Sequence, residues 1–182
     1  MKIISGKYKG KSIKMPKGIR PTQDKVRKAL FDIVSDVEGV SFLELFAGSG
    51  SVAIEALSHG AKKVVLVEEE PNCVKVIKEN FSLIGYPDYN LIASDIGLAL
   101  SRLDKEGAKF DIIFMDPPYY RDMAKKTLQI LASYDILTPS GFIATEHFKK
   151  DNLPDALGDL VLFRQYKYGD TLLSFYNKKS IK

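Results

Sequence analysis

From Val40 onward, short apolar runs alternate with longer segments of helical periodicity. The apolar runs predict strands over residues 40–46, 63–68, 89–94, 110–115 and 141–147. The segments between them predict helices over residues 51–58, 71–84, 96–103 and 121–132. Alternation of this kind favours a parallel sheet covered by helices on both faces. Two last runs, 160–168 and 171–178, flank Gly169-Asp170 as the strands of an antiparallel hairpin do. We therefore expect an α/β fold with a seven-stranded, mostly parallel sheet.

The beginning of the chain is strongly basic. Ten of the first 28 residues are Lys or Arg, against Asp24 alone, so a polyanion is a plausible partner at this end. Residues 1–19 alternate apolar and basic residues around glycines, which predicts a small basic β-hairpin as an appendage. Residues 20–182 form the main domain, which begins with a helix capped at Thr22, with Arg27 on its solvent side.

The composition of the chain indicates the cellular compartment of the protein. Cys73 is the only cysteine, so an internal disulfide and a cysteine metal cluster are both excluded, as is usual in a reducing compartment. No stretch approaches the roughly 18 apolar residues that a membrane span needs. We expect a cytoplasmic protein without a membrane segment or a metal.

The turn after the first strand, with Gly48 and Gly50, has the pattern of a ligand-binding loop. Glycines let the backbone turn sharply and approach a ligand, and the helix that follows presents free N–H groups. A tight turn without a ligand would use the same residues. The stretch also fits the dinucleotide pattern G-x-G-x-x-A, with Glu68 at the expected distance, so a dehydrogenase is a first alternative.

Acidic residues lie at the ends of the first three predicted strands. Glu68 is placed to accept hydrogen bonds from ribose hydroxyls, although Glu69 follows at once. Glu44 would repel a pyrophosphate and would instead accept from the ammonium group of S-adenosylmethionine. Asp95 could meet an adenine amino group or cap the next helix. Three acids at successive strand ends suit a ligand that is rich in donors and positively charged.

The stretch "DPPY" ends the fourth predicted strand. Asp116 and Pro117 each precede a proline, which excludes the helical region and favours extended geometry for both. A carboxylate and a carbonyl held in one pocket would accept both hydrogens of an exocyclic amino group and direct its lone pair at an electrophilic methyl group. Tyr119 could stack on the ring that carries the amine. A rigid turn with packed tyrosines is the simpler alternative.

These segments together resemble a known family. The stretches "ELFAGSG", "VEEE", "SD" and "DPPYY" look like the successive motifs of class I S-adenosylmethionine-dependent amino-methyltransferases. The stretches "SGKYKGKSIKMP", "IRPTQDKVRKALF", "EALSHGA", the "EH" at 146–147 and "YGDTLLSFY" resemble, over nearly the whole chain, the RsmD family of small-subunit ribosomal RNA guanine-N2 methyltransferases.

The resemblance implies a Rossmann-like class I methyltransferase fold, S-adenosyl-L-methionine as cofactor, and 16S rRNA or the small ribosomal subunit as substrate. The implied catalytic residues are Asp116, Pro117, Pro118 and Tyr119. The implied cofactor-binding residues are Glu44, Phe46, Ala47, Gly48, Ser49, Gly50, Glu68, Glu69, Asp95 and Ile96. Candidate RNA-binding residues are Lys7, Lys9, Lys11, Lys14 and Arg20.

Several alternatives stay open at this point. The lysines could form a merely solvated face, and Arg20 could close over the cofactor instead of meeting a phosphate. His147 is expected to be structural or to line the substrate. Another RNA, a DNA adenine or a protein glutamine could be the acceptor, and a non-catalytic RNA-binding or ribosome-assembly protein is an alternative of another class. We expect a monomer.

Overall fold

The computed structural model describes residues 1–18, 24–34, 36–118 and 122–179. Its strands are β1 (Ser41–Leu45), β2 (Lys63–Glu68), β3 (Asn90–Ala93), β4 (Phe110–Met115), β5 (Leu137–Phe148), β6 (Ala156–Leu157), β7 (Leu160–Tyr168) and β8 (Thr171–Lys178). Its helices are the 3-10 turn η1 (Gly6–Tyr8) and α1 (Asp24–Val34), α2 (Ser51–Ser58), α3 (Pro71–Ile84), α4 (Ile96–Lys105) and α5 (Met123–Ala132). Within this part of the chain, no helix has the length and apolar character to span a bilayer.

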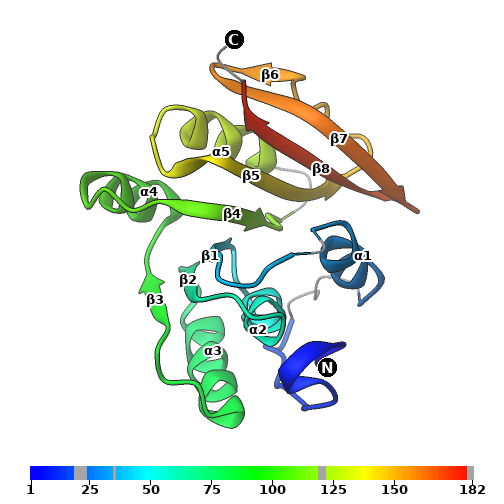
Figure 1. Cartoon of the computed structure of the whole chain (residues 1–182), viewed down its shortest axis with the longest axis vertical. Coiled ribbons are helices and arrows are strands. Elements are labelled where there is room, and N and C mark those ends of the chain that lie inside the picture. The colour runs from blue at the N-terminus through cyan, green and yellow to red at the C-terminus, as the bar shows by residue number, and fades with distance from the viewer. Residues whose placement is uncertain (19–23, 35, 119–121, 180–182) are drawn as a thin grey trace.

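All the strands belong to one sheet, in the order β3-β2-β1-β4-β5-β8-β7-β6 (Figure 1). Strands β1 to β5 run parallel, and β8 and β7 add an antiparallel hairpin to β5, which confirms the expected α/β fold. The described sheet has eight strands where seven were expected. The extra strand, β6, pairs two residues with the edge strand β7 and is too short to give a periodic pattern.

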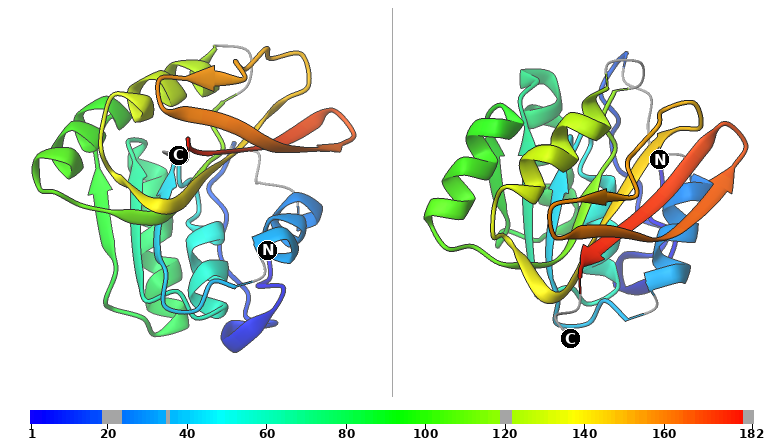
Figure 2. Two further views of the ribbon diagram at one scale, coloured as in Figure 1. Left: turned by 45° about the horizontal axis from the view of Figure 1, so that its top comes forward. Right: turned by 90° about the horizontal axis from the view of Figure 1, so that it is seen from above.

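Two apolar cores lie on the two faces of the sheet. Successive side chains of a strand point to opposite faces, so Phe42 of β1 packs in the core under α1, α2 and α3, whereas Leu43 packs in the core under α4 and α5. Figure 2 shows α1 in blue and α4 in green on opposite sides of the molecule. Because helices cover both faces of the parallel strands, a ligand can reach this part of the sheet at the two ends of the strands.

Residues 1–18, the basic segment, pack against α2 and share its core. One isolated bridge, Lys2 to Ser12, pairs the two arms, and η1 forms the turn, so the pairing is less regular than the hairpin that the sequence predicts. Ile3, Tyr8 and Ile13 are buried in the core that holds α2. Every residue of α2 is buried as a result, with the sheet on one side and the basic segment on the other.

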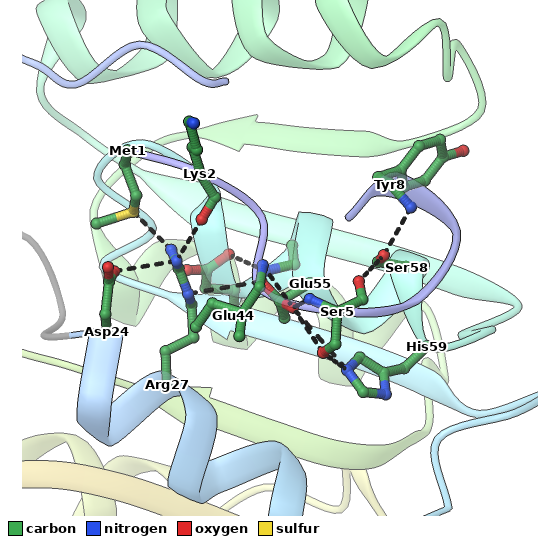
Figure 3. Close-up of polar contacts among 12 residues, drawn as sticks. Met1, Lys2, Ser5, Tyr8, Asp24, Arg27, Glu44, Glu55, Ser58 and His59 are labelled. Carbon is green, nitrogen blue, oxygen red and sulfur yellow. Dashed lines mark hydrogen bonds and ion pairs between the residues drawn. The ribbon is translucent and has the colours of Figure 1, made fainter. Parts of the chain in front are cut away.

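Polar side chains of α2 hold the basic segment in place (Figure 3). Glu55 is 1% exposed and accepts hydrogen bonds from the backbone of Ile4, at 3.0 Å, and of Ser5, at 2.8 Å. Ser58 accepts a hydrogen bond from the backbone of Tyr8 at 2.8 Å. Buried backbone groups need such partners, and a single irregular bridge supplies few of them.

Arg27 lies on the buried side of α1, so the prediction that it faces solvent is wrong. Its side chain is fully buried, with Nε 3.6 Å from Oε2 of Glu55. Its Nη2 donates to the carbonyl of Lys2 at 2.7 Å and to Asp24 at 3.1 Å. Because Glu55 is buried as well, the guanidinium balances a charge that would otherwise be strongly unfavourable in the core.

Candidate active site

The carboxyl ends of β1 and β4 form the point where the strand order reverses. The chain moves outward from β1 through β2 to β3, then returns to place β4 on the other side of β1. In open α/β sheets a ligand binds in the crevice outside such a point. Leu45 pairs with Met115, so Phe46 and Asp116, the next residues, come from neighbouring strands at this edge.

Three carboxylates share one sheet face at this edge. Glu44 and Glu68 occupy strand positions that point toward α2, because each lies an even number of residues from a side chain of that core. Asp116 comes two residues after Phe114, which packs in the same core, and it is half-buried. The negative charges of Asp116 and Glu68 both raise the pKa of Glu44, in agreement with this placement.

Glu44 is strongly perturbed by its surroundings. It is 3% exposed, and burial raises its pKa to about 8, with hydrogen bonds from the backbone of Ala53 and Val52 acting in the opposite direction. The Ala53 N–H of α2 donates to Oε2 at 2.8 Å. A carboxylate therefore already occupies the helix start where the dinucleotide pattern would place a pyrophosphate, which disfavours the dehydrogenase alternative.

The loop from Phe46 to Gly50 has a strained backbone. Phe46 has φ +57°, Gly48 +55° and Gly50 +72°, the left-handed region that only glycine adopts freely. A Cβ on Gly50 would lie 3.1 Å from Leu66 and 3.3 Å from Phe81, whereas among the described residues one on Gly48 would meet only the Phe46 carbonyl, at 4.0 Å. With respect to the described residues, the backbone at Gly48 thus borders open space, as close approach of a ligand requires.

Glu68 fixes this loop from the next strand. Its Oε2 accepts from the Gly48 N–H at 2.7 Å, and its Oε1 accepts from the Glu70 N–H at 2.9 Å. Glu68 is 8% exposed, whereas Glu69 is exposed. Each carboxylate oxygen has a second lone pair, so Glu68 can still accept from a ribose hydroxyl. Between the two acids, burial at the strand end favours Glu68 for that role.

The remaining candidate cofactor residues differ in position. Ala47 and Ser49 are buried within the loop. Asp95 caps α4, with Oδ1 accepting from the Leu98 N–H at 3.1 Å, so the capping alternative is confirmed and the adenine contact stays a prediction. Ile96 is buried in the core on the far face of the sheet.

The "DPP" stretch leaves the sheet directly after β4. Pro117 is buried and Pro118 is exposed. Tyr119 and Arg20 lie outside the described residues, so the roles predicted for them stay predictions. Within the described ranges, no group of three His, Cys, Asp or Glu residues is arranged to hold a metal ion.

Glu146 and His147 lie near the end of β5, the strand beside β4. Met115 pairs with Thr145, which places Glu146 beside Asp116, and Glu146 is 2% exposed. Nδ1 of His147 donates to the Phe148 carbonyl at 3.1 Å, and Nε2 lies 2.8 Å from the Ser174 hydroxyl. Burial lowers the pKa of His147 and so favours the neutral ring. These contacts within β5 and β8 give His147 a structural role.

The lysines predicted to bind RNA lie on the surface of the basic segment. Lys7, Lys9, Lys11 and Lys14 are all exposed. The ammonium groups of Lys7 and Lys11 lie 5.4 and 5.3 Å from the ring centre of Tyr8. The Lys11 ammonium also donates to the Ile84 carbonyl at 3.3 Å, and that of Lys14 lies 2.8 Å from Glu79, so these two charges have partners within the protein. The backbone of the segment is held against α2.

Asn80 of α3 is a site residue that the sequence analysis missed. It is fully buried, and its side-chain amide contacts both the candidate cofactor loop, residues 46–50, at Ser49, and the basic segment, at Lys14. Its position on the apolar stripe of α3, with Ile77 and Ile84, was the available signal, because a polar residue on such a stripe needs a buried partner.

Comparison with known proteins fits this geometry. A family model described as "Conserved hypothetical protein 95" matches residues 1–177. The Bacillus subtilis protein named "Putative rRNA methyltransferase YlbH" is 36% identical, over 98% of this chain and 100% of its own length. The Escherichia coli K12 protein named "Ribosomal RNA small subunit methyltransferase D" is 28% identical, over 99% and 91%. The chain belongs to the RsmD family.

A solved structure supports the same conclusion for the fold. Hypothetical protein TTHA0928 of Thermus thermophilus superposes with a TM-score of 0.86, at 31% identity, over 97% of this chain and 99% of that one. The α/β sheet with its antiparallel C-terminal hairpin is thus the class I methyltransferase fold of the RsmD family. The family resemblance expected from the sequence is confirmed.

Proposed function

We propose that this RsmD-family protein transfers a methyl group from S-adenosylmethionine to the exocyclic N2 amine of a guanine in small-subunit ribosomal RNA. The observation that carries the proposal is the meeting of Glu44, Glu68 and Asp116 on one sheet face at the reversal point. The name of the Escherichia coli relative supports the choice of RNA. A ribosomal RNA substrate would place the enzyme in the cytoplasm. We expect the enzyme to be a monomer.

The residues at this edge fit S-adenosylmethionine. Glu44 would hold the ammonium group at the methionine end, and Glu68 would hold the ribose hydroxyls, each through lone pairs that remain on its oxygens. The open space at Gly48 lets the backbone approach the ligand closely. A cluster of three acidic side chains, in which Glu44 can give up its proton to an adjacent ammonium group, favours a cationic ligand over a pyrophosphate. When bound, this cofactor supplies an electrophilic methyl group on a positively charged sulfur.

Asp116 and the carbonyl of Pro117 would orient the amine. The prolines restrict both residues to extended backbone, and two fixed acceptors take the two N–H groups of the exocyclic amine. The nitrogen lone pair is then directed at the methyl group, so catalysis comes from positioning and from electrostatic stabilisation. The product amine loses its extra proton readily, so the reaction needs neither a strong base nor a metal ion.

The basic segment would bind the RNA backbone while one guanine leaves its stack. Extruding a base costs a few kcal/mol, and phosphate contacts by exposed lysines can offset that cost. Lys7 and Lys9 carry exposed charges on a backbone fixed to α2. Arg20 remains a candidate phosphate contact.

The test is transfer of labelled methyl to three acceptors: small subunits lacking the modification, their naked RNA, and duplex DNA. We expect label in the subunits or their RNA, recovered as N2-methylguanine. Label only in DNA or protein would refute the RNA substrate. RNA binding without turnover would favour a non-catalytic assembly protein.

Asp116→Asn tests the catalytic role. Loss of the carboxylate should reduce turnover by at least about 100-fold while the affinity for S-adenosylhomocysteine stays within about threefold. Asp88→Asn, at an exposed carboxylate before β3, is the matched control and should leave turnover unchanged. Normal turnover in Asp116→Asn would remove this residue from the mechanism.

A further inference from the structure

Asn80 connects the two parts of the molecule that the proposed function uses separately. It is fully buried on α3, between the loop that would hold the cofactor and the segment that would hold the RNA. Its Nδ2 donates to the Ser49 carbonyl at 2.9 Å and to the Lys14 carbonyl at 3.0 Å. Its Oδ1 accepts from the Lys14 N–H at 2.7 Å.

These three hydrogen bonds explain why position 80 requires an asparagine. Two carbonyls and one N–H surround the amide, so both Nδ2 hydrogens are used and only one orientation of the amide satisfies every partner. The pair of bonds to Lys14 uses the N–H and C=O of one residue, as a neighbouring strand would. An aspartate of the same size would lose both donors and face two carbonyls.

The rest of α3 makes each attachment firm. Ile77 and Phe81 are buried on α3, as Asn80 is, and a Cβ on Gly50 would be 3.5 and 3.3 Å from them. The cofactor loop therefore rests on apolar side chains at Gly50 and on the amide at Ser49. On the other side, the ammonium of Lys14 lies 2.8 Å from Glu79.

We propose that Asn80 is a positioning residue that makes cofactor binding and RNA binding cooperative. The inference rests on the proposed function, because it assigns the two ligands to the loop and to the segment. A ligand that orders the loop at Ser49 also orders the amide, and with it the Lys14 backbone, so the second ligand loses less conformational entropy. Coupling of this kind is reciprocal between the two ligands.

The experiment measures the affinity for a small-subunit rRNA transcript at fixed salt, with and without saturating S-adenosylhomocysteine. We expect the wild-type protein to bind the transcript on the order of tenfold more tightly with the cofactor product present. In Asn80→Ala and the isosteric Asn80→Asp, the ratio of the RNA affinities with and without S-adenosylhomocysteine should fall close to one. Glu79→Gln, which removes the ion pair to Lys14 but keeps the three amide bonds, should retain the wild-type ratio.

Hydrogen exchange on the wild-type protein provides a measurement that needs no variant. The Lys14 N–H, which donates to Asn80, should exchange at least about threefold more slowly once S-adenosylhomocysteine binds. This result decides the question if the Asn80 variants fail to fold. Three results would each overturn the inference. They are an exchange rate at the Lys14 N–H that S-adenosylhomocysteine leaves unchanged, a wild-type RNA affinity that S-adenosylhomocysteine leaves unchanged, or a wild-type increase in RNA affinity in a folded Asn80→Ala protein.

Failure of the proposed function would look different. In that case the wild-type protein would bind no S-adenosylhomocysteine or transfer no methyl group to RNA. If both ligands bind and methyl transfer occurs, but the two affinities are independent, only the role of Asn80 is refuted.

Discussion

Binding of the proposed cofactor should release a proton from Glu44. Burial, and to a lesser extent the charges of Asp116 and Glu68, raises the pKa of Glu44 to about 8. The folded protein therefore keeps a proton that the unfolded chain loses near its ordinary value of 4.5. The stability that this proton contributes is complete below that value and is lost as the pH rises through 8. An ammonium group placed beside Glu44 reverses the preference, because it stabilises the carboxylate.

The size of the effect follows from the pKa. With a pKa of about 8, Glu44 is roughly 90% protonated at pH 7, so binding should release about 0.9 proton. Between about pH 5.5 and 7, where an α-amino group stays charged, affinity should rise almost tenfold per pH unit. Above pH 8 this gain should level off, because Glu44 is then ionised before binding.

Isothermal titration calorimetry in two buffers of different ionisation enthalpy measures the proton directly. S-adenosylhomocysteine carries the ammonium group and should show the release, whereas 5′-methylthioadenosine has the same nucleoside without the amino acid and should show none. Glu44→Gln should abolish the release on binding of S-adenosylhomocysteine. Equal proton release by both ligands, or none by S-adenosylhomocysteine, would refute the placement of the ammonium at Glu44.

Three further predictions concern the basic segment. Gly6→Ala should destabilise the fold by at least about 2 kcal/mol more than Gly10→Ala in urea denaturation, because both glycines have positive φ but only at Gly6 would a Cβ collide with the α2 backbone, at 1.9 Å. Arg27→Met should cost about 3–5 kcal/mol by leaving Glu55 charged and buried, and a second change, Glu55→Gln, should recover part of that loss. Lys9→Ala should lower the salt dependence of RNA binding by about one unit of log–log slope.

Each of these has a clear contrary result. Equal stability of the two alanine variants would mean that the segment moves off α2 at little cost. A double variant no more stable than Arg27→Met alone would show that packing, and not charge balance, is what the arginine supplies. An unchanged salt slope would remove Lys9 from the RNA contacts.

The parallel sheet could be predicted because each of its strands is encoded by a local sequence pattern. Each strand between Val40 and His147 is a short apolar run bounded by turn residues, and parallel strands bring their carboxyl ends to one edge by geometry alone. The placement of Glu44, Glu68 and Asp116 at that edge follows from the same rule. Their common face also follows, from counting residues along each strand.

What the sequence did not reveal depends on contacts between distant residues. Arg27 carries a charge on an amphipathic helix, where solvent is the ordinary choice, and only Glu55, far along the chain, makes its burial possible. The basic segment has the alternation of a hairpin, yet the backbone N–H groups of Ile4, Ser5 and Tyr8 donate to side chains of α2. Asn80 has no motif of its own, and its role appears only when Ser49 and Lys14 are found on either side of it.

The position of β8 has a consequence for synthesis. The last of the described strands along the chain, β8, lies inside the sheet, between β5 and β7, and not at its edge. Until Thr171 to Lys178 have been synthesised, β5 presents an open edge and β7 has no neighbour through which to join the sheet. A nascent chain can thus complete the proposed cofactor edge from β1 to β4 early, but the described sheet closes only with β8. A truncation before Thr171 would therefore remove β8, detach β7 and β6 from the sheet, and leave β5 free to pair with another chain.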